Sequence, residues 1–105
     1  MSDSVNENST SYVTAVPKDA DGVAALPASM VYQIDCVTTG TAIKAETALT
    51  PGTSVEIEID AADNAIISQT NAVERRQVTV TAGYGINDQV IEVYEYRVIN
   101  LNAVT

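Results

Sequence analysis

The sequence predicts an all-β fold, built as a single β-sandwich of about seven antiparallel strands. The chain has no Phe or Trp and its five aromatic residues are all Tyr, so Val, Ile, Leu and Ala must fill the core. β-branched residues such as Val and Ile favour strands. Turn signals separate short strand-like segments about every eight to twelve residues, a spacing typical of a sandwich or barrel.

Seven segments have the character of strands, because β-branched or aromatic residues fill them and Pro, Gly, Asn or Asp stand near their ends. They are residues 12–16, 30–38, 41–49, 54–60, 65–68, 75–82 and 89–100. Within residues 54–60, aliphatic and acidic side chains alternate, a period of two that directs the aliphatic ones to the core. Residues 61–67 can form one helical turn at most.

The same alternation predicts which side chains form the core. Six residues should be largely buried: Ile34, Val55, Ile57, Ile59, Val78 and Val80. In residues 89–100 both faces carry apolar side chains, which indicates that a second surface, such as a neighbouring subunit, covers part of this strand. Gly83 and Gly85 flank Tyr84 and predict a bend or a β-bulge.

The first ten residues differ in composition from the rest. Residues 1–10 are Ser, Asn, Asp, Glu and Thr around a single Val after the initial Met, and they bury too little apolar area to offset their own ordering entropy. We expect a flexible polar N-terminal arm over residues 1–10 and a sandwich domain over residues 11–105. In an assembly, the arm could add its backbone to the strand edge of a neighbour.

Charge and cysteine content restrict the class of protein. The formal net charge is −9 and the five Lys and Arg residues are mostly dispersed, which argues against binding nucleic acid. Cys36 is the only cysteine, so we expect it to pack as a small apolar residue in a protein made in the cytoplasm. An apolar run of about 20 residues and a signal peptide are both missing, so membrane association is not expected.

Catalytic and metal chemistry are not expected. The chain has no His, the residue most often used in general acid–base catalysis near neutral pH. Asp19 and Asp21 precede Gly22 as in the opening of a calcium loop, but Met30 stands where the closing carboxylate belongs. We therefore predict no enzyme, no cofactor and no metal site.

Two features remain as candidates for contact with a partner. Arg75 and Arg76 concentrate the positive charge at the start of one strand, where they could pair with the chain's own carboxylates or with an acidic patch on a neighbour. Tyr84, between two glycines, is the best candidate for an exposed aromatic ring, such as a carbohydrate site would use.

Six stretches have characteristic strand and turn patterns, namely residues 30–36, 38–40, 49–52, 63–67, 74–80 and 96–101. In these stretches, residues 27–101 resemble small β-sandwich proteins of the virions of tailed bacteriophages and prophages. The strand count is also similar to that of immunoglobulin-like and fibronectin type III accessory modules, although the core Trp and the paired Cys of antibody domains are missing.

The resemblance implies a structural role in a phage particle. The chain would be a multi-copy virion subunit, made in the host cytoplasm, that decorates or stabilises the capsid or joins the head–tail connector through contacts with other virion proteins. The partner-binding residues would be Ser2, Asp3, Ser4, Val5, Asn6, Glu7, Arg75, Arg76 and Tyr84. The alternative is a free-standing immunoglobulin-like module that binds a receptor or a carbohydrate.

Overall fold

A computed structural model describes residues 3–19, 21–68, 70–85 and 88–101. Within this part, the chain forms seven strands and one short 3-10 helix. In chain order they are β1 (Asp3–Asn6), β2 (Ser11–Ala15), β3 (Ser29–Cys36), β4 (Thr41–Leu49), β5 (Val55–Ile59), η1 (Ala61–Asn64), β6 (Val73–Gly85) and β7 (Asp88–Ile99).

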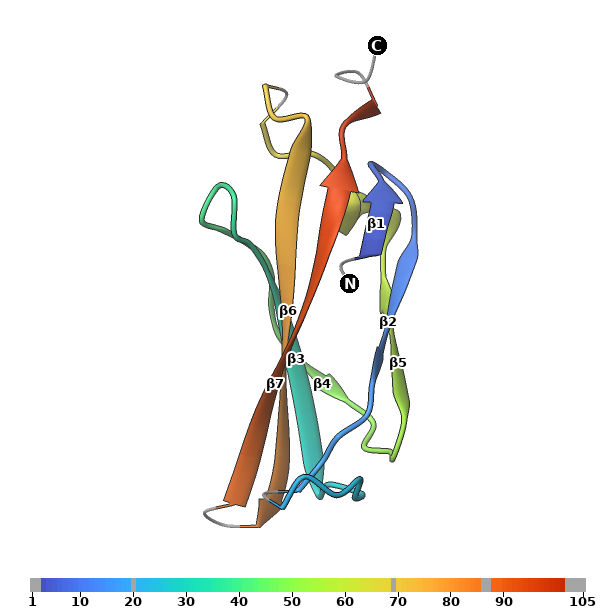
Figure 1. Cartoon of the computed structure of the whole chain (residues 1–105), viewed down its shortest axis with the longest axis vertical. Helices are drawn as coiled ribbons and strands as arrows, with labels where there is room; N and C mark the ends of the chain where they lie inside the picture. Colours follow the sequence, from blue (N-terminus) through green and yellow to red (C-terminus); the bar gives the residue numbers. More distant parts are fainter. Residues whose placement is uncertain (1–2, 20, 69, 86–87, 102–105) are drawn as a thin grey trace.

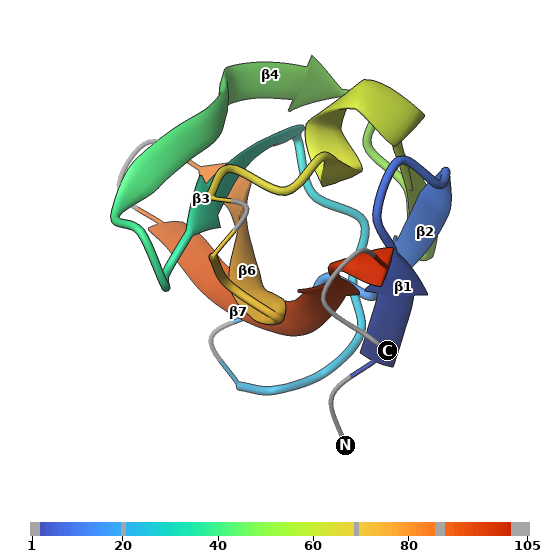
Figure 2. The ribbon, with the colours of Figure 1, turned by 90° about the horizontal axis from the view of Figure 1, so that it is seen from above.

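The strands form two sheets that face each other, as the prediction of a β-sandwich requires (Figure 1). The larger sheet has five strands in the order β1-β7-β6-β3-β4, and the smaller sheet pairs β2 with β5. Every pair is antiparallel except β1 with β7, which is parallel. Seen from above, the strands of the two sheets surround a central space (Figure 2).

The sandwich is elongated. Its principal extents are 49 × 20 × 20 Å and its radius of gyration is 14.8 Å, whereas a compact domain of this length would have about 13 Å. The cause is the length of β6 and β7, which have 13 and 12 residues. Long strands give the larger sheet long edges, and one of these edges forms the candidate site below.

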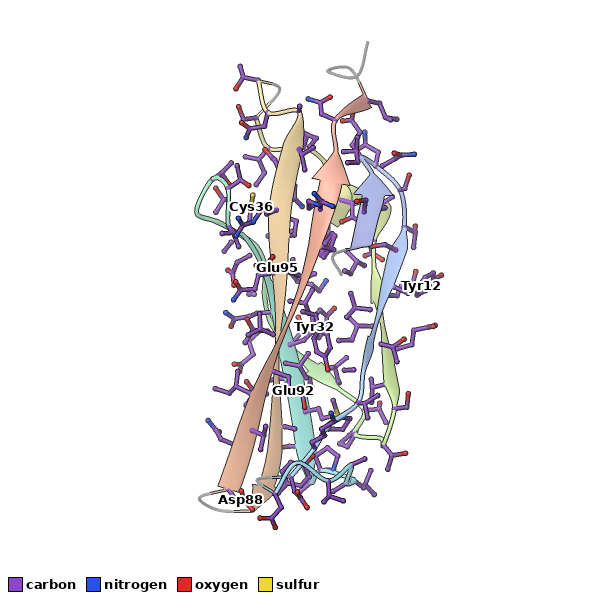
Figure 3. The ribbon with its side chains drawn as sticks, viewed as in Figure 1. Tyr12, Tyr32, Cys36, Asp88, Glu92 and Glu95 are labelled. Atoms are coloured by element: carbon purple, nitrogen blue, oxygen red, sulfur yellow. The ribbon has the colours of Figure 1, made fainter. Side chains whose placement is uncertain are left out.

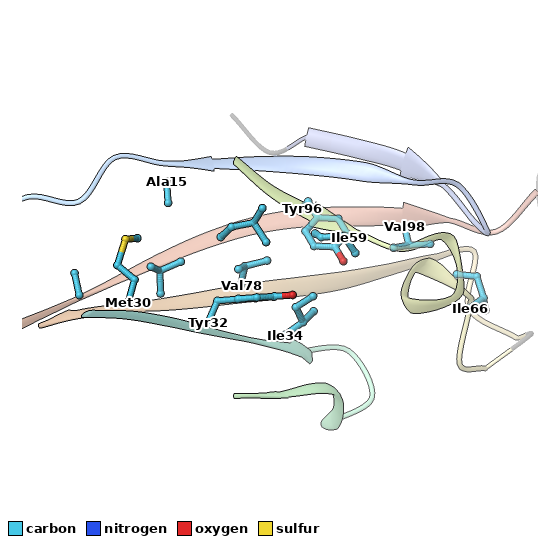
Figure 4. Close-up of a cluster of buried hydrophobic side chains, with 12 residues drawn as sticks. Ala15, Met30, Tyr32, Ile34, Ile59, Ile66, Val78, Tyr96 and Val98 are labelled. Atoms are coloured by element: carbon cyan, nitrogen blue, oxygen red, sulfur yellow. The ribbon is translucent and has the colours of Figure 1, made fainter. Parts of the chain in front are cut away.

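The core side chains come from both sheets (Figure 4). Five of the six predicted core residues are confirmed, with exposed fractions of at most 3%. They are Ile34, Ile57, Ile59, Val78 and Val80. The sixth, Val55, is partly buried against this cluster. Cys36 is a buried free cysteine, as expected.

Most strand predictions are confirmed, but residues 65–68 are not a strand. The backbone N–H groups of Ile67 and Ser68 donate to the carboxylate of Glu74 instead of to a neighbouring strand. The single helical turn expected nearby is η1. At the end of β6, the pairing with β7 shifts between Gly83 and Gly85, which confirms the predicted bulge.

The N-terminal segment lies on the larger sheet, which corrects the expectation of a free arm. Residues 3–6 form β1 and pair with residues 96–99 of β7. Val5 packs partly buried against the core. A strand on a sheet edge is held by backbone hydrogen bonds and needs few apolar side chains, so the polar composition did not reveal it. Residues 1 and 2, including the predicted contact residue Ser2, lie outside the described residues.

Candidate interaction site

Arg76, predicted as a partner-binding residue, lies inside the protein. Its side chain is fully buried, and its Nη2 atom lies 2.9 Å from Oε1 of Glu74, which is also fully buried. The guanidinium also donates to the backbone carbonyls of Asp63 at 2.8 Å and Ala65 at 2.7 Å. The sequence allowed Arg76 to pair either with the chain's own carboxylates or with a neighbour. In the structure it pairs with the chain's own Glu74.

The Glu74 carboxylate holds the segment between η1 and β6. It accepts hydrogen bonds from the backbone of Ile67 and Ser68, both at 2.9 Å, and from the Asn71 side chain at 3.0 Å. Burial alone would raise the pKa of Glu74, but these donors and Arg76 together lower it from 4.5 to about 2. The hydrogen bonds of the folded state thus stabilise the ionised form of Glu74.

Acid should destabilise the protein through this group. The pKa of Glu74 is lowered in the folded state, so its stabilisation is complete above pH 4.5 and is lost as the pH falls towards 2. The free energy of unfolding should decrease by up to about 3 kcal/mol over this interval from Glu74 alone. Urea titrations between neutral pH and pH 2 measure this. A Glu74→Gln variant should be less stable at neutral pH and should show a smaller acid-induced decrease; an unchanged decrease would contradict the assignment.

A second buried polar group, Asn64, fixes the connection from β1 to β2. Its amide donates to the backbone carbonyl of Ser9 at 2.8 Å and to the hydroxyl of Ser11 at 2.9 Å. Its side-chain oxygen accepts a hydrogen bond from the hydroxyl of Tyr96 at 2.8 Å. Asn8 adopts a φ of 59°, a left-handed conformation that Asn tolerates well. In the sequence, position 64 stood out only as part of a stretch of strand and turn patterns, so this role was missed.

The other predicted contact residues have partners within the chain. Glu7 accepts a hydrogen bond from the backbone N–H of Leu101 at 2.8 Å. Ser4 and Asn6 are exposed residues of β1, whereas Asp3 pairs through its backbone with Tyr96. The prediction assumed that these residues extend towards a neighbouring subunit. In the structure, residues 3–6 instead pair with β7 of the same chain.

Arg75 is more accessible to a partner protein than Tyr84. Arg75 is exposed, and its guanidinium lies 3.7 Å from the carboxylate of Glu95. Tyr84 is half-buried and its hydroxyl donates to the backbone carbonyl of Ala25 at 3.2 Å. The predicted exposed ring at Tyr84 is therefore corrected, because this tyrosine anchors the loop before β3.

Within the described residues, the edge of β7 has no partner strand before the position where β1 begins. β1 pairs with residues 96–99 of β7, and in the described part of the chain the preceding residues pair with β6 alone. A groove of about 810 Å³ lies beside the region where the pairing with β1 begins. Residues 93–96 of β7 and residues 10–14, which include most of β2, line this groove, and Ser4 and Val5 of β1 close one end. Figure 3 labels Glu92 and Glu95 on β7 and Tyr12 on β2.

The open edge of β7 presents alternate backbone groups to the groove. The carbonyl of Ile99 accepts a hydrogen bond from Glu7 on the β1 side, whereas the N–H of Asn100 donates to Ala72 on the β6 side. In an antiparallel pair, the N–H and C=O of one residue face the same side, and the side alternates along the strand. The odd-numbered residues between positions 88 and 96 therefore direct their backbone groups away from β6, and two of them, Val93 and Glu95, line the groove.

Two of the odd-numbered residues of β7 carry the most exposed large aliphatic side chains of the sheet. Ile91 and Val93 are 56% and 55% exposed on the outer face. The prediction that residues 89–100 have two apolar faces is confirmed, with Tyr96 and Val98 inward. Within the residues that the structure describes, no other part of the chain buries Ile91 and Val93.

The described residues contain no group of three or more His, Cys, Asp and Glu side chains placed to hold a metal ion. The Asp19 carboxylate accepts hydrogen bonds from the backbone N–H groups of Asp21 and Val23, each at 3.0 Å. It thereby stabilises its own turn. In residues 3–101, apart from the undescribed positions, no helix is long and apolar enough to span a bilayer.

Comparisons with protein family models, with curated proteins and with solved structures found no match to this chain.

Proposed function

We propose that this chain is a non-enzymatic structural subunit that acts through protein–protein contacts. The observation that carries this proposal is the open edge of β7 beside the groove, together with the exposed Ile91 and Val93. An unpaired strand edge is a template for pairing with another chain, and proteins usually cover or blunt such edges. A partner that covers this edge would satisfy its backbone groups and bury the adjacent aliphatic side chains.

The particle we propose for it is the virion of a tailed bacteriophage, on the capsid surface or at the head–tail connector. The support is the resemblance of residues 27–101 to small virion sandwich proteins. The elongated shape, 49 Å in its longest dimension, suits a subunit that contacts its surroundings along its length. The net charge of −9 keeps free subunits apart before they reach the particle.

Purification of particles tests this proposal. Particles released from a host strain that encodes the chain are banded on a density gradient and washed with high salt, and the band is analysed by quantitative mass spectrometry. We expect the chain to stay with the particles in a constant ratio to the major capsid protein, while abundant host proteins are removed. If the chain is found only in the soluble fraction, the virion assignment is wrong.

A free-standing binding module is the second candidate, and Tyr12 favours it. The ring of Tyr12 is 57% exposed at the rim of the groove, where Ser and Thr hydroxyls also gather. Exposed tyrosines and hydroxyls suit the recognition of a sugar or a receptor loop. A glycan array distinguishes the candidates: selective binding that a Tyr12→Ala variant loses would favour the module.

A further inference from the structure

We propose that the outer face of the larger sheet binds a second copy of this chain, so that two copies pack face to face about a two-fold axis that crosses their strands. This contact deepens the proposed function and rests on it, since it names one partner of the structural subunit. Three features of the described residues carry it: the exposed aliphatic side chains of this face, its net charge, and the order of charges along β7.

Strand alternation defines the outer face. Because the core side chains of β3, β6 and β7 come from even-numbered residues, the odd-numbered residues of these strands face outward. We call the odd-numbered residues within 29–35, 75–83 and 89–97 the outer patch. The pairing register aligns them in rows across the three strands, and two adjacent rows at the centre contain only uncharged side chains. They are Ile91, Thr81 and Val31 in one row and Val93, Thr79 and Gln33 in the next.

The centre of the outer patch is aliphatic. Ile91 and Val93 are 56% and 55% exposed, and burial of apolar surface is the main driving force of most protein association. Three strands about 4.8 Å apart and nine residues of about 3.3 Å each give the patch roughly 14 × 30 Å. The area that two such patches bury lies at the low end for specific interfaces, so we expect a weak, reversible dimer.

The outer patch carries no net charge, in contrast to the whole chain. It contains two arginines, Arg75 and Arg97, and two carboxylates, Asp35 and Glu95. The net charge of −9 therefore arises entirely outside the patch. Arg75 lies 3.7 Å from Glu95, so these two charges offset each other within one copy. A second copy meets no excess of negative charge here, whereas the exposed side chains of β5 on the smaller sheet are glutamates.

The order of charges along β7 favours a two-fold arrangement. Asp88 and Arg97 are exposed near opposite ends of β7, and within the described residues neither forms an ion pair; Figure 3 shows Asp88 at its end of the strand. A two-fold axis that crosses the strands between Ile91 and Val93 places each of these side chains opposite the other in the second copy. The same axis places the Arg97 end of each copy opposite the Asp88 end of the other, so opposite charges meet twice.

Sedimentation equilibrium of the full chain measures the association. Between about 10 μM and 1 mM protein we expect a reversible monomer–dimer equilibrium without larger species, since an isologous contact closes after two copies. Salt screens the repulsion between two copies of charge −9, so raising NaCl from about 20 mM to about 300 mM should tighten the dimer at least threefold. A chain that stays monomeric throughout overturns the inference, and so does an open series of larger species.

Two matched variants locate the contact. Val93 lies in the outer patch, whereas Val23 lies between β2 and β3 and outside it; they are 55% and 60% exposed, and replacing either with Lys changes the net charge equally. Val93→Lys should weaken the dimer about tenfold or more, because it brings a charge into the aliphatic centre of the contact. Val23→Lys should change it less than about twofold. Circular dichroism and urea denaturation verify that both variants stay folded, and equal weakening overturns the inference.

Exchanging the two end charges tests the two-fold arrangement. At about 300 mM NaCl, where long-range repulsion is screened, Arg97→Asp and Asp88→Arg should each weaken the dimer about three- to tenfold, and the double variant should recover most of the loss. Net charge alone would act differently, because Asp88→Arg makes the chain less acidic and would strengthen association. Strengthening by Asp88→Arg, or no recovery in the double variant, overturns the arrangement.

Two outcomes separate this contact from the proposed function. If the chain forms the dimer but never copurifies with particles, the contact stands and the virion role is wrong. If the chain copurifies with particles but is monomeric in solution, and Val93→Lys and Val23→Lys enter particles equally, the contact is wrong and the structural role stands.

Discussion

Replacing Arg76 with alanine should lower the free energy of unfolding by about 3–5 kcal/mol, because it leaves the Glu74 carboxylate buried without its cation. Both side chains are fully buried and their charged atoms lie 2.9 Å apart. The substitution also removes the donors to the carbonyls of Asp63 and Ala65. Chemical denaturation at neutral pH measures the loss.

Arg75 is the control for this change. It precedes Arg76 and is exposed, and its guanidinium lies 3.7 Å from the carboxylate of Glu95. Exposed ion pairs contribute little, so Arg75→Ala should change the stability by less than about 1 kcal/mol. A double variant, Glu74→Leu with Arg76→Met, should recover part of the loss, because it removes both buried charges. Equal effects of Arg75→Ala and Arg76→Ala would contradict the buried ion pair.

The burial of this pair could have been predicted from the sequence by extending an alternation already recognised. Val78 and Val80 were assigned to the core, and the same parity, continued towards the start of the strand, places Arg76 and Glu74 on the core face. The sequence instead left open whether Arg76 pairs with the chain's own carboxylates or with a neighbour. Side-chain alternation is a local property of a strand, which explains why the cores of β3, β5 and β6 were predicted well.

The position of β1 could not have been predicted in this way. Its pairing with β7 joins residues more than 90 positions apart and depends on an edge that becomes available only when the sheet has formed. Neither the polar composition of residues 1–10 nor their single Val at position 5 indicates a parallel partner. The groove lies beside the region where the pairing of β1 with β7 begins, so it could not have been predicted from the sequence either.

The last prediction concerns the core between the sheets. Ile57 is 1% exposed on β5, where it belongs to the cluster that joins the smaller sheet to the larger one. Ile57→Ala should lower the free energy of unfolding by about 2–5 kcal/mol, since it removes buried apolar atoms and leaves a cavity that close packing only partly closes.

Ile91→Ala makes the same chemical change on the surface. Ile91 is 56% exposed on the outer face of β7, so the free subunit should lose only about 0.5 kcal/mol or less. Urea denaturation of the two variants, monitored by circular dichroism, gives the comparison. Equal losses would show that the two sheets are not joined through Ile57. A small loss for Ile91→Ala also makes this variant suitable for testing contacts at the β7 edge, because a change in partner binding could then not be attributed to unfolding.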